Sequence, residues 1–174
     1  MKRLILMRHA KSDWSDLTAS DHERTLNARG RTSADALGNW LRAQSITPDH
    51  VLCSDAARTC ETLARLSLGD VATTTTRALY LAEPDVMLSK LRACEEDCIL
   101  LIAHNPGCGM LAEMLLNNPP THPAFYSYPT GATLIADFEI TSWREVLEAA
   151  RDQYETAINH HHEISLVDSP LQVG

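Results

Sequence analysis

Residues 4–12 read Leu-Ile-Leu-Met-Arg-His-Ala-Lys-Ser, an unbroken apolar run that ends abruptly in polar and charged side chains. Four consecutive apolar residues are typical of a strand that is buried on both faces of a sheet. Arg8 and His9 follow the run directly, so we expect both at the carboxyl end of a buried strand. In open α/β sheets, that end of the strands is where ligands bind.

Similar apolar runs alternate with helical patterns along the rest of the chain. Strand patterns occur at Val51–Cys53, Thr73–Thr76, Cys98–Ala103, Ala132–Phe138 and Ile164–Val167. Apolar residues at helical spacing separate most of these runs, and a further helical pattern begins beyond Thr141. This alternation predicts an α/β fold with three αβα layers and a mostly parallel central sheet.

A few residues mark the expected helix ends. Asn27 is a candidate N-cap for the first helix. Ser54 and Asp55 are N-cap candidates for a second helix, which Gly69 would close. Pro84 would open a third helix, because proline is favoured at the first helical position.

The bulk composition is that of an ordinary soluble domain. The chain has 174 residues, which suits one domain spanning 1–174, and 44% of the residues are hydrophobic. The formal net charge is -8. Because affinity for nucleic acid depends on Lys and Arg, this charge argues against a nucleic-acid partner. It does not exclude a local arginine cluster that binds one phosphate.

The cysteine content and the start of the chain indicate a reduced, cytoplasmic protein. The five cysteines are an odd number, and no Cys or His pairs have zinc-site spacing, so we expect packing roles and no metal. They are Cys53, Cys60, Cys94, Cys98 and Cys108. No stretch reaches the length of a membrane span, and Arg8 cuts the first apolar run too early for a signal sequence.

Two arginines and two histidines follow three separate predicted strands. Arg8 and His9 follow the first strand, Arg58 follows the turn after Val51–Cys53, and His104 follows Cys98–Ala103. Arginine presents a planar fork of donors that matches phosphate oxygens. Nearby arginines also lower the pKa of a histidine, which keeps it neutral and nucleophilic. Its other ring nitrogen would then need an acceptor, such as a backbone carbonyl.

At these positions the sequence resembles the histidine phosphatase superfamily, and in particular its SixA-type branch. Arg8-His9-Ala10 resembles the Arg-His-Gly signature, with Ala10 in place of Gly. Residues 54–62 resemble the Ser-x-x-x-Arg-x-x-x-Thr motif, and residues 102–106 resemble the second-histidine motif. Residues 21–27 with Gly30 resemble the Arg-x-Leu segment of the SixA-type branch.

This resemblance implies a phosphoglycerate mutase-like fold and a phosphatase mechanism. His9 would attack phosphorus and become phosphohistidine, while Arg8, Arg58 and His104 would bind the phosphoryl oxygens. Water would then release inorganic phosphate. No metal and no organic cofactor are implied. In the SixA-type branch the substrate is the phosphohistidine of a signalling or phosphotransfer protein.

The sequence departs from the family at the proton donor. Many members carry an acid in the region that corresponds to Leu79–Ala82, where this chain has none. The candidate donors are Glu83, Asp85, Asp13 and Asp16, and Glu83 is the nearest. For Glu83 the start of a helix at Pro84 is the stronger explanation. A site without a strong acid suits a phosphohistidine better than an alkyl phosphate, because the nitrogen leaves more easily than an alkoxide.

Two further cations and two other functions stay open. Lys11 and Arg24 are candidate substrate-binding residues, but a solvated lysine and a salt-bridged arginine fit the same pattern. One alternative function is a general phosphatase for small phosphomonoesters. The other is a phospho-binding module without catalysis, which would not need a nucleophile.

Overall fold

The computed structural model describes residues 1–149 and 165–167 of the chain. Its strands form one sheet in the order β3-β2-β4-β1-β5-β6. They are β1 (Lys2–Arg8), β2 (His50–Ser54), β3 (Ala72–Thr76), β4 (Cys98–Ala103), β5 (Thr133–Phe138) and β6 (Ser165–Val167).

Four neighbouring strands of this sheet run parallel. β1 pairs with β4, β4 with β2, and β2 with β3, all in parallel register, whereas β5 is antiparallel to β1 and β6 is antiparallel to β5. The mostly parallel sheet expected from the sequence is therefore confirmed. Because the four strands share one direction, their carboxyl ends meet at one edge of the sheet.

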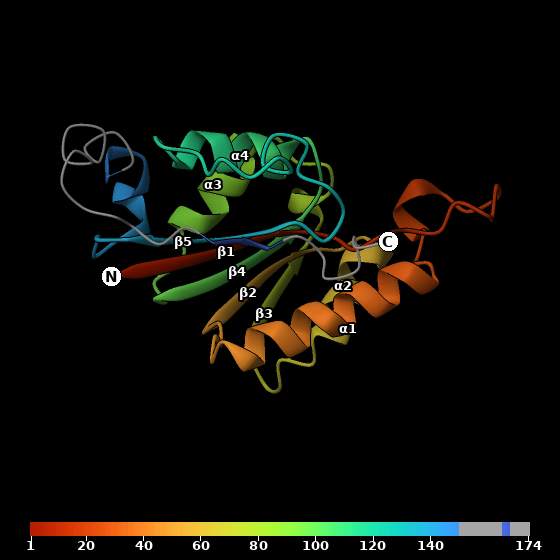
Figure 1. Cartoon of the computed structure of the whole chain (residues 1–174). Coiled ribbons are helices and arrows are strands. Elements are labelled where there is room, and N and C mark those ends of the chain that lie inside the picture. Colours follow the sequence, from red (N-terminus) through yellow and green to blue (C-terminus); the bar gives the residue numbers. More distant parts are fainter. Residues whose placement is uncertain (150–164, 168–174) are drawn as a thin grey trace.

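Helices cover both faces of the sheet (Figure 1). α1 (Ala28–Ala43) and α2 (Ala57–Leu66) lie on one face, and α3 (Pro84–Arg92) and α4 (Gly107–Leu115) lie on the other. Short 3-10 helices occur at Asp21–Glu23, Arg77–Leu79 and Trp143–Glu145. The arrangement is the three-layer αβα fold that the sequence predicts.

The central strand β1 explains why the opening apolar run is unbroken. Leu4 and Leu6 belong to the cluster of buried side chains that includes α3 and α4. Ile5 and Met7 belong to the cluster on the α1 and α2 side. Side chains alternate between the faces of a strand, so both sets are fully buried here.

Two of the predicted helix starts are confirmed. The side chain of Asn27 accepts a hydrogen bond from the backbone N–H of Gly30 at 2.8 Å, which caps α1. Pro84 is the first residue of α3.

The predicted ends of the second helix were wrong. α2 begins at Ala57 after Ala56, which has no capping side chain, and Ser67 ends it in the left-handed conformation with φ of 51°. Ser54, Asp55 and Gly69 therefore do not have the expected roles. The Ser54 hydroxyl lies 2.8 Å from a ring nitrogen of His104, so a contact between distant parts of the chain engages it instead.

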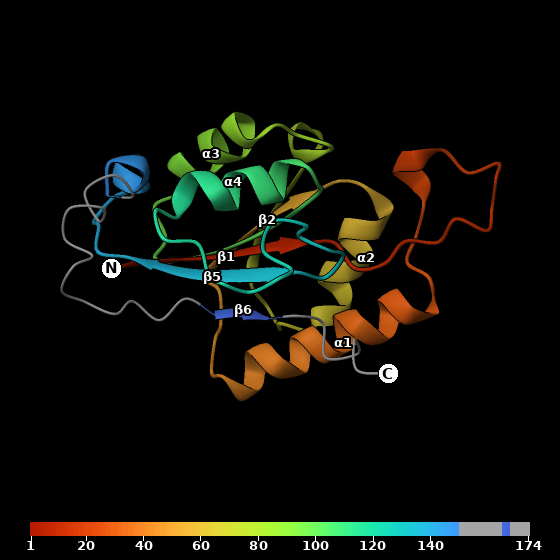
Figure 2. The ribbon, with the colours of Figure 1, turned by 45° about the horizontal axis from the view of Figure 1, so that its top comes forward.

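Two long connections lie at the carboxyl edge of the parallel strands. The segment between β1 and α1 projects from the body of the molecule (Figure 2). The connection between α4 and β5 is anchored by Tyr128, which is buried and donates its hydroxyl to the Leu6 carbonyl at 2.7 Å.

The helical pattern expected beyond Thr141 appears at 143–149, and its remainder lies outside the described residues. Within the described residues, no helix is long and apolar enough to cross a membrane.

Candidate active site

The four residues singled out by the sequence lie together in one pocket of about 220 Å³. Arg8 and His9 come from the end of β1, Arg58 from the first turn of α2, and His104 from the residue after β4. The pocket is lined by Arg8, His9, Lys11, Ser12, Trp14, Asp21, Arg58, Leu81, His104, Asn105 and Thr130.

His9 is held in one orientation and in one tautomer. Its side chain is buried, and its Nδ1 lies 2.7 Å from the Ala10 carbonyl oxygen. A carbonyl can only accept, so Nδ1 carries the proton and Nε2 keeps its lone pair. Arg58 donates from Nε toward this Nε2 at 3.3 Å. The Nε2 lone pair therefore faces the Arg58 guanidinium, beside which an anion would be held.

The surroundings of His9 keep it neutral. Burial lowers the pKa of His9 to about 4, and the charges of Arg58 and Arg8 act in the same direction. The hydrogen bond to the Ala10 carbonyl opposes this shift. Because the ordinary histidine pKa is about 6.5, His9 is unprotonated at neutral pH.

His104 has one ring nitrogen that contacts Ser54 and one that has no hydrogen-bond partner among the described residues. Its Nε2 lies 2.8 Å from the Ser54 hydroxyl oxygen, and its Nδ1 is buried without a partner among the described residues. Burial, foremost, and the neighbouring His9 and Arg58 lower its pKa to about 3. When the Ser54 hydroxyl donates to Nε2, the proton of the neutral ring lies on Nδ1. That N–H is free to bind an oxygen of a ligand.

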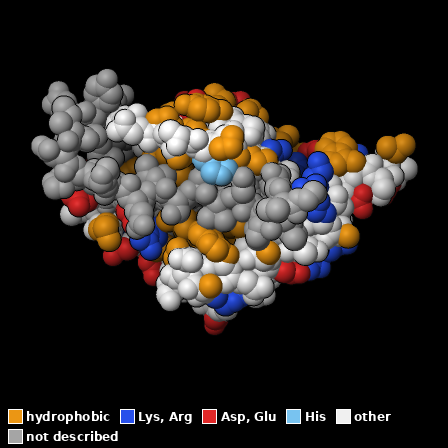
Figure 3. Space-filling view, in the orientation of Figure 1, with side chains coloured by type: hydrophobic (Ala, Val, Ile, Leu, Met, Phe, Trp, Pro, Cys, Tyr) orange, Lys and Arg blue, Asp and Glu red, His pale blue; other side chains and the backbone are white. Residues whose placement is uncertain are grey.

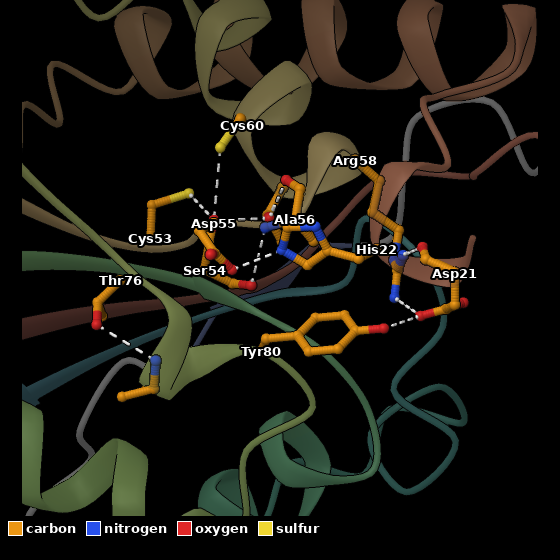
Figure 4. A network of polar contacts seen from close by, with 12 residues as sticks. Asp21, His22, Cys53, Ser54, Asp55, Ala56, Arg58, Cys60, Thr76 and Tyr80 are labelled. Carbon is orange, nitrogen blue, oxygen red and sulfur yellow. Dashed lines mark hydrogen bonds and ion pairs between the residues drawn. The ribbon is translucent and has the colours of Figure 1, made fainter. Parts of the chain in front are cut away.

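Arg58 is paired with Asp21 in the pocket (Figure 4). Its Nη1 donates to the Asp21 backbone carbonyl, and its Nη2 donates to Asp21 Oδ2 at 2.9 Å. The same carboxylate accepts a hydrogen bond from the Tyr80 hydroxyl. Burial of Asp21 opposes ionisation, but the bonds from Tyr80 and Arg58 outweigh it and lower the pKa of the carboxyl. Asp21 is therefore an ionised group that occupies part of the arginine fork.

Arg8 supplies a second guanidinium at the end of β1. One of its terminal nitrogens, Nη1, donates to the Tyr128 carbonyl at 2.9 Å. Its Nε is buried and has no hydrogen-bond partner among the described residues. The side chain is therefore fixed in place by one bond and keeps a donor for a ligand.

The pocket is strongly cationic although the chain is acidic overall. Arg8, Lys11 and Arg58 line it together with a single carboxylate from the described residues, Asp21. In Figure 3, Lys and Arg side chains gather where the projecting segment joins the body, and hydrophobic side chains lie on its outer part. Fixed cationic donors around a small cavity favour an anion such as a phosphoryl group.

Three further candidates from the sequence differ in position. Lys11 lines the pocket, whereas Arg24 and Glu83 are absent from its lining. Arg24 stacks over the ring of Trp14 at 4.3 Å and donates to the Asp16 carbonyl at 2.9 Å. Glu83 is the residue before α3, which is the structural role considered for it above.

Sequence reasoning missed several residues of the pocket. Asp21 precedes Arg24 in the segment that resembles the SixA-type branch, so its place in that motif was the available signal. Asn105 directly follows His104, and it donates to the Tyr128 carbonyl at 2.9 Å. No sequence motif points to Leu81 or Thr130, because they line the pocket only as a result of how their loops fold.

The described residues contain no group of three or more His, Cys, Asp or Glu side chains suited to a metal ion. The donors that converge on the pocket are guanidinium, ammonium and imidazole N–H groups. Such a donor set matches anion oxygens rather than a cation.

Comparison with known sequences places these features in a family. The model of the histidine phosphatase superfamily (branch 1) matches residues 4–80. An uncharacterized protein of Mycobacterium tuberculosis is 36% identical over 120 residues, which cover 68% of this chain and 75% of the relative. An uncharacterized protein of Mycobacterium leprae is 32% identical over 139 residues, which cover 74% of this chain and 85% of the relative.

Solved structures of similar fold include proteins provisionally assigned as SixA phosphohistidine phosphatases. One from Nakamurella multipartitia has a TM-score of 0.70 and 26% identity, and covers 84% of this chain and 90% of its own. One from Agrobacterium tumefaciens has a TM-score of 0.69 and 25% identity, with 79% and 92% covered. The protein histidine phosphatase SixA complexed with tungstate shares the fold, at a TM-score of 0.68 and 22% identity, with 78% and 88% covered. These likenesses confirm the phosphoglycerate mutase-like fold.

Proposed function

The chain belongs to the histidine phosphatase superfamily, and on that premise we propose that it is a phosphatase with His9 Nε2 as its covalent nucleophile. One observation carries the proposal. The bond from Nδ1 to the Ala10 carbonyl directs the Nε2 lone pair toward Arg58, inside a pocket lined by cations. A binding module would not need a histidine that is held neutral and oriented in this way.

In the first step, the lone pair of His9 Nε2 attacks phosphorus. The P–Nε2 bond forms as the bond from phosphorus to the leaving group breaks, and the leaving atom takes the bonding electron pair. Negative charge spreads over the three phosphoryl oxygens in such a transition state. Arg8, Arg58 and the free Nδ1–H of His104 are the donors that stabilise it.

In the second step, a water oxygen attacks phosphorus and the P–Nε2 bond breaks. The electron pair of that bond returns to Nε2. Both protons of the water leave with the inorganic phosphate. Throughout both steps the Ala10 carbonyl keeps Nδ1 protonated and stabilises the positive charge of the phosphorylated ring. His9 ends in the tautomer in which it began.

The acid–base groups of the pocket favour a nitrogen leaving group. Glu83 does not line the pocket, and Asp21, which does, has a lowered pKa and is ionised. An alkoxide cannot leave readily without a proton donor. The imidazole of a phosphohistidine leaves as a neutral ring when its other nitrogen already carries a proton. We therefore propose phosphohistidine on another protein as the substrate.

The rim of the pocket supports a protein substrate. Trp14 lines the pocket and is 60% exposed, and Leu81 lines it and is 51% exposed. Leu17, in the same projecting segment as Trp14, is 88% exposed. Large apolar side chains that face solvent beside a small polar pocket are suited to contact a partner surface around the phosphorylated side chain.

The test compares phosphate release from a phosphohistidine-bearing phosphotransfer domain and from glycerol 2-phosphate, an alkyl ester whose leaving group needs a proton, without added metal. We expect the wild type to hydrolyse the phosphohistidine protein and to leave the ester largely intact. His9→Ala should abolish release. His50→Ala is the matched control, because His50 lies at the opposite end of β2.

The alternatives give different results. Release mainly from the ester would identify a small-molecule phosphatase. Loss of His9-dependent release from both substrates, with inorganic phosphate still bound, would identify a phospho-binding module. Acid-labile phosphate on His9 after rapid quenching is expected only for the proposed covalent route.

A further inference from the structure

Two cysteines lie on either side of the turn that joins β2 to α2. Cys53 is the buried residue before the end of β2, and Cys60 is a half-buried residue of α2. Their sulfur atoms lie 3.2 Å and 3.6 Å from one acceptor, the Ser54 carbonyl oxygen (Figure 4). Because both sulfur atoms contact the same oxygen atom, they are neighbours, and a change of side-chain rotamer would bring them together.

The residues between these cysteines belong to the candidate active site. Ser54 holds Nε2 of His104 through its hydroxyl, and Arg58 donates to Nε2 of His9. Thr59 donates its hydroxyl to the same Ser54 carbonyl at 2.8 Å. A covalent link from Cys53 to Cys60 would thus close a ring that contains the two groups positioning both histidines.

The two thiols differ in reactivity. The neighbouring Cys53 thiol lowers the pKa of Cys60, although burial and the nearby Asp55 carboxylate oppose this shift. The neighbouring Cys60 thiol and burial raise the pKa of Cys53. His22, which pairs with Asp55 at 2.8 Å, also favours the Cys60 thiolate. A thiolate beside a protonated thiol is the arrangement of an attacking and a resolving cysteine.

We propose that Cys60 and Cys53 form a peroxide-sensitive thiol pair whose disulfide inactivates the phosphatase site. In the first step, the Cys60 thiolate attacks a peroxide oxygen, the O–O bond breaks, and the departing hydroxide takes a proton to become water. In the second step, Cys53 attacks the resulting sulfenic sulfur, the S–O bond breaks, and the second hydroxide takes the Cys53 proton. Both thiols lose one electron each, and hydrogen peroxide is reduced to water.

The disulfide would deform the turn that it spans. A disulfide needs an S–S length of about 2.05 Å, which is shorter than any contact between two thiols. Oxidation also removes both S–H donors from the Ser54 carbonyl. The turn must tighten, which moves Ser54 relative to His104 and Arg58 relative to His9. Misplacement by about 1 Å lowers catalysis by about 100-fold. This effect on activity rests on the proposed phosphatase function.

The test uses the purified, reduced full-length chain, which is treated with hydrogen peroxide and then with catalase. Trypsin cleaves after Arg58, so Cys53 and Cys60 fall in separate peptides, 43–58 and 59–65. We expect non-reducing mass spectrometry to find these two peptides joined. Phosphate release should fall by about 100-fold and recover with dithiothreitol.

Two variants and a binding measurement serve as controls. Cys60→Ser should keep its activity in peroxide, and Cys94→Ser should remain as sensitive as wild type. Cys53→Ser should retain a sulfenic acid at Cys60 that dimedone labels. Joined peptides with unchanged activity, or equal inactivation of Cys60→Ser, would overturn the proposal. If the reduced chain has no phosphatase activity, phosphate binding tests the thiol pair instead. Inorganic phosphate should raise the melting temperature of the reduced chain, and oxidation should abolish this rise.

Discussion

At the scale of single residues, the site combines permanent cations with neutral histidines. Guanidinium groups stay charged at any ordinary pH, so Arg8 and Arg58 can bind a phosphoryl group throughout. The histidines have the opposite requirement, because a protonated Nε2 has no lone pair with which to attack. Burial beside the arginines satisfies both conditions at once. In the proposed mechanism, the charges that bind the substrate are the same charges that keep Nε2 of His9 unprotonated.

The first prediction concerns the protonation of His9. In the folded protein, Nε2 of His9 should titrate with a midpoint of about 4, because burial and the arginines disfavour the imidazolium. Heteronuclear NMR of the imidazole nitrogens measures this midpoint directly. In denaturing urea the same residue should titrate at about 6.5. A midpoint of about 6.5 in the folded protein would contradict the neutral-nucleophile argument.

The second prediction concerns Asp21, which occupies part of the Arg58 fork. Its carboxylate competes with a phosphate for Nη2 of Arg58 and repels the anion. We expect Asp21→Asn to bind inorganic phosphate about tenfold more tightly, as measured by isothermal titration calorimetry. Asp16→Asn is the matched control, because Asp16 lies in the same loop and bonds Thr18 instead. Unchanged affinity in Asp21→Asn would show that the carboxylate does not compete.

At the scale of elements, the contact between α1 and α2 fixes the helix that carries Arg58. Gly38 of α1 lies so close to the end of α2 that an added Cβ would be 2.2 Å from the Leu66 carbonyl oxygen. Gly30, near the start of α1, approaches the Lys11 carbonyl in the same way, at 2.1 Å. Glycine thus allows α1 to pack against both α2 and the loop that follows β1.

The third prediction tests this close approach. Gly38→Ala should lower the free energy of unfolding by about 1–3 kcal/mol, because the backbone of α2 must move away. Alanine in place of glycine in an open helix normally has the opposite effect, a gain of about 1 kcal/mol. Gly109→Ala in α4 is the control, since its added Cβ would meet no atom closer than 3.4 Å. Urea denaturation of both variants shows whether each substitution lowers or raises the free energy of unfolding.

At the scale of the whole molecule, the buried neutral histidines link stability to pH. The folded pKa values of His9 and His104 are about 4 and about 3, whereas unfolded histidine has a pKa of about 6.5. Between these values the unfolded chain binds protons that the folded chain does not. The free energy of unfolding therefore falls as the pH drops below about 6.5.

The fourth prediction is the size of this effect. From pH 6.5 to pH 5, each of the two histidines should lower the free energy of unfolding by on the order of 2 kcal/mol. This window lies above the range in which the shifted carboxyls Asp21 and Glu61 take up protons. Urea denaturation at several pH values measures the slope, and His104→Gln should reduce it by about half. A flat profile in the wild type would mean that the histidines are charged in the folded protein.

Much of the fold follows from local sequence patterns, namely apolar runs and residues that start helices. The apolar run that ends at Met7 and the run Cys98–Ala103 are long enough and apolar enough to require a strand covered on both faces. Pro84 and Asn27 determine helix starts through their own backbone and side-chain chemistry. The local pattern gave the wrong role for Ser54. Its hydroxyl contacts His104, which is 50 residues away in the sequence.

By itself, the sequence determined the layer architecture. It also determined that Arg8, His9 and His104 lie at strand ends and that Arg58 follows the turn after β2, because the carboxyl ends of parallel strands lie at one edge of the sheet. Only the tertiary structure decided what surrounds them. The pairing of Asp21 with Arg58, and the shared carbonyl of the two thiols, depend on the paths of loops and on the contact of α2 with β2. Those paths are set by packing between segments far apart in the chain, which no local pattern encodes.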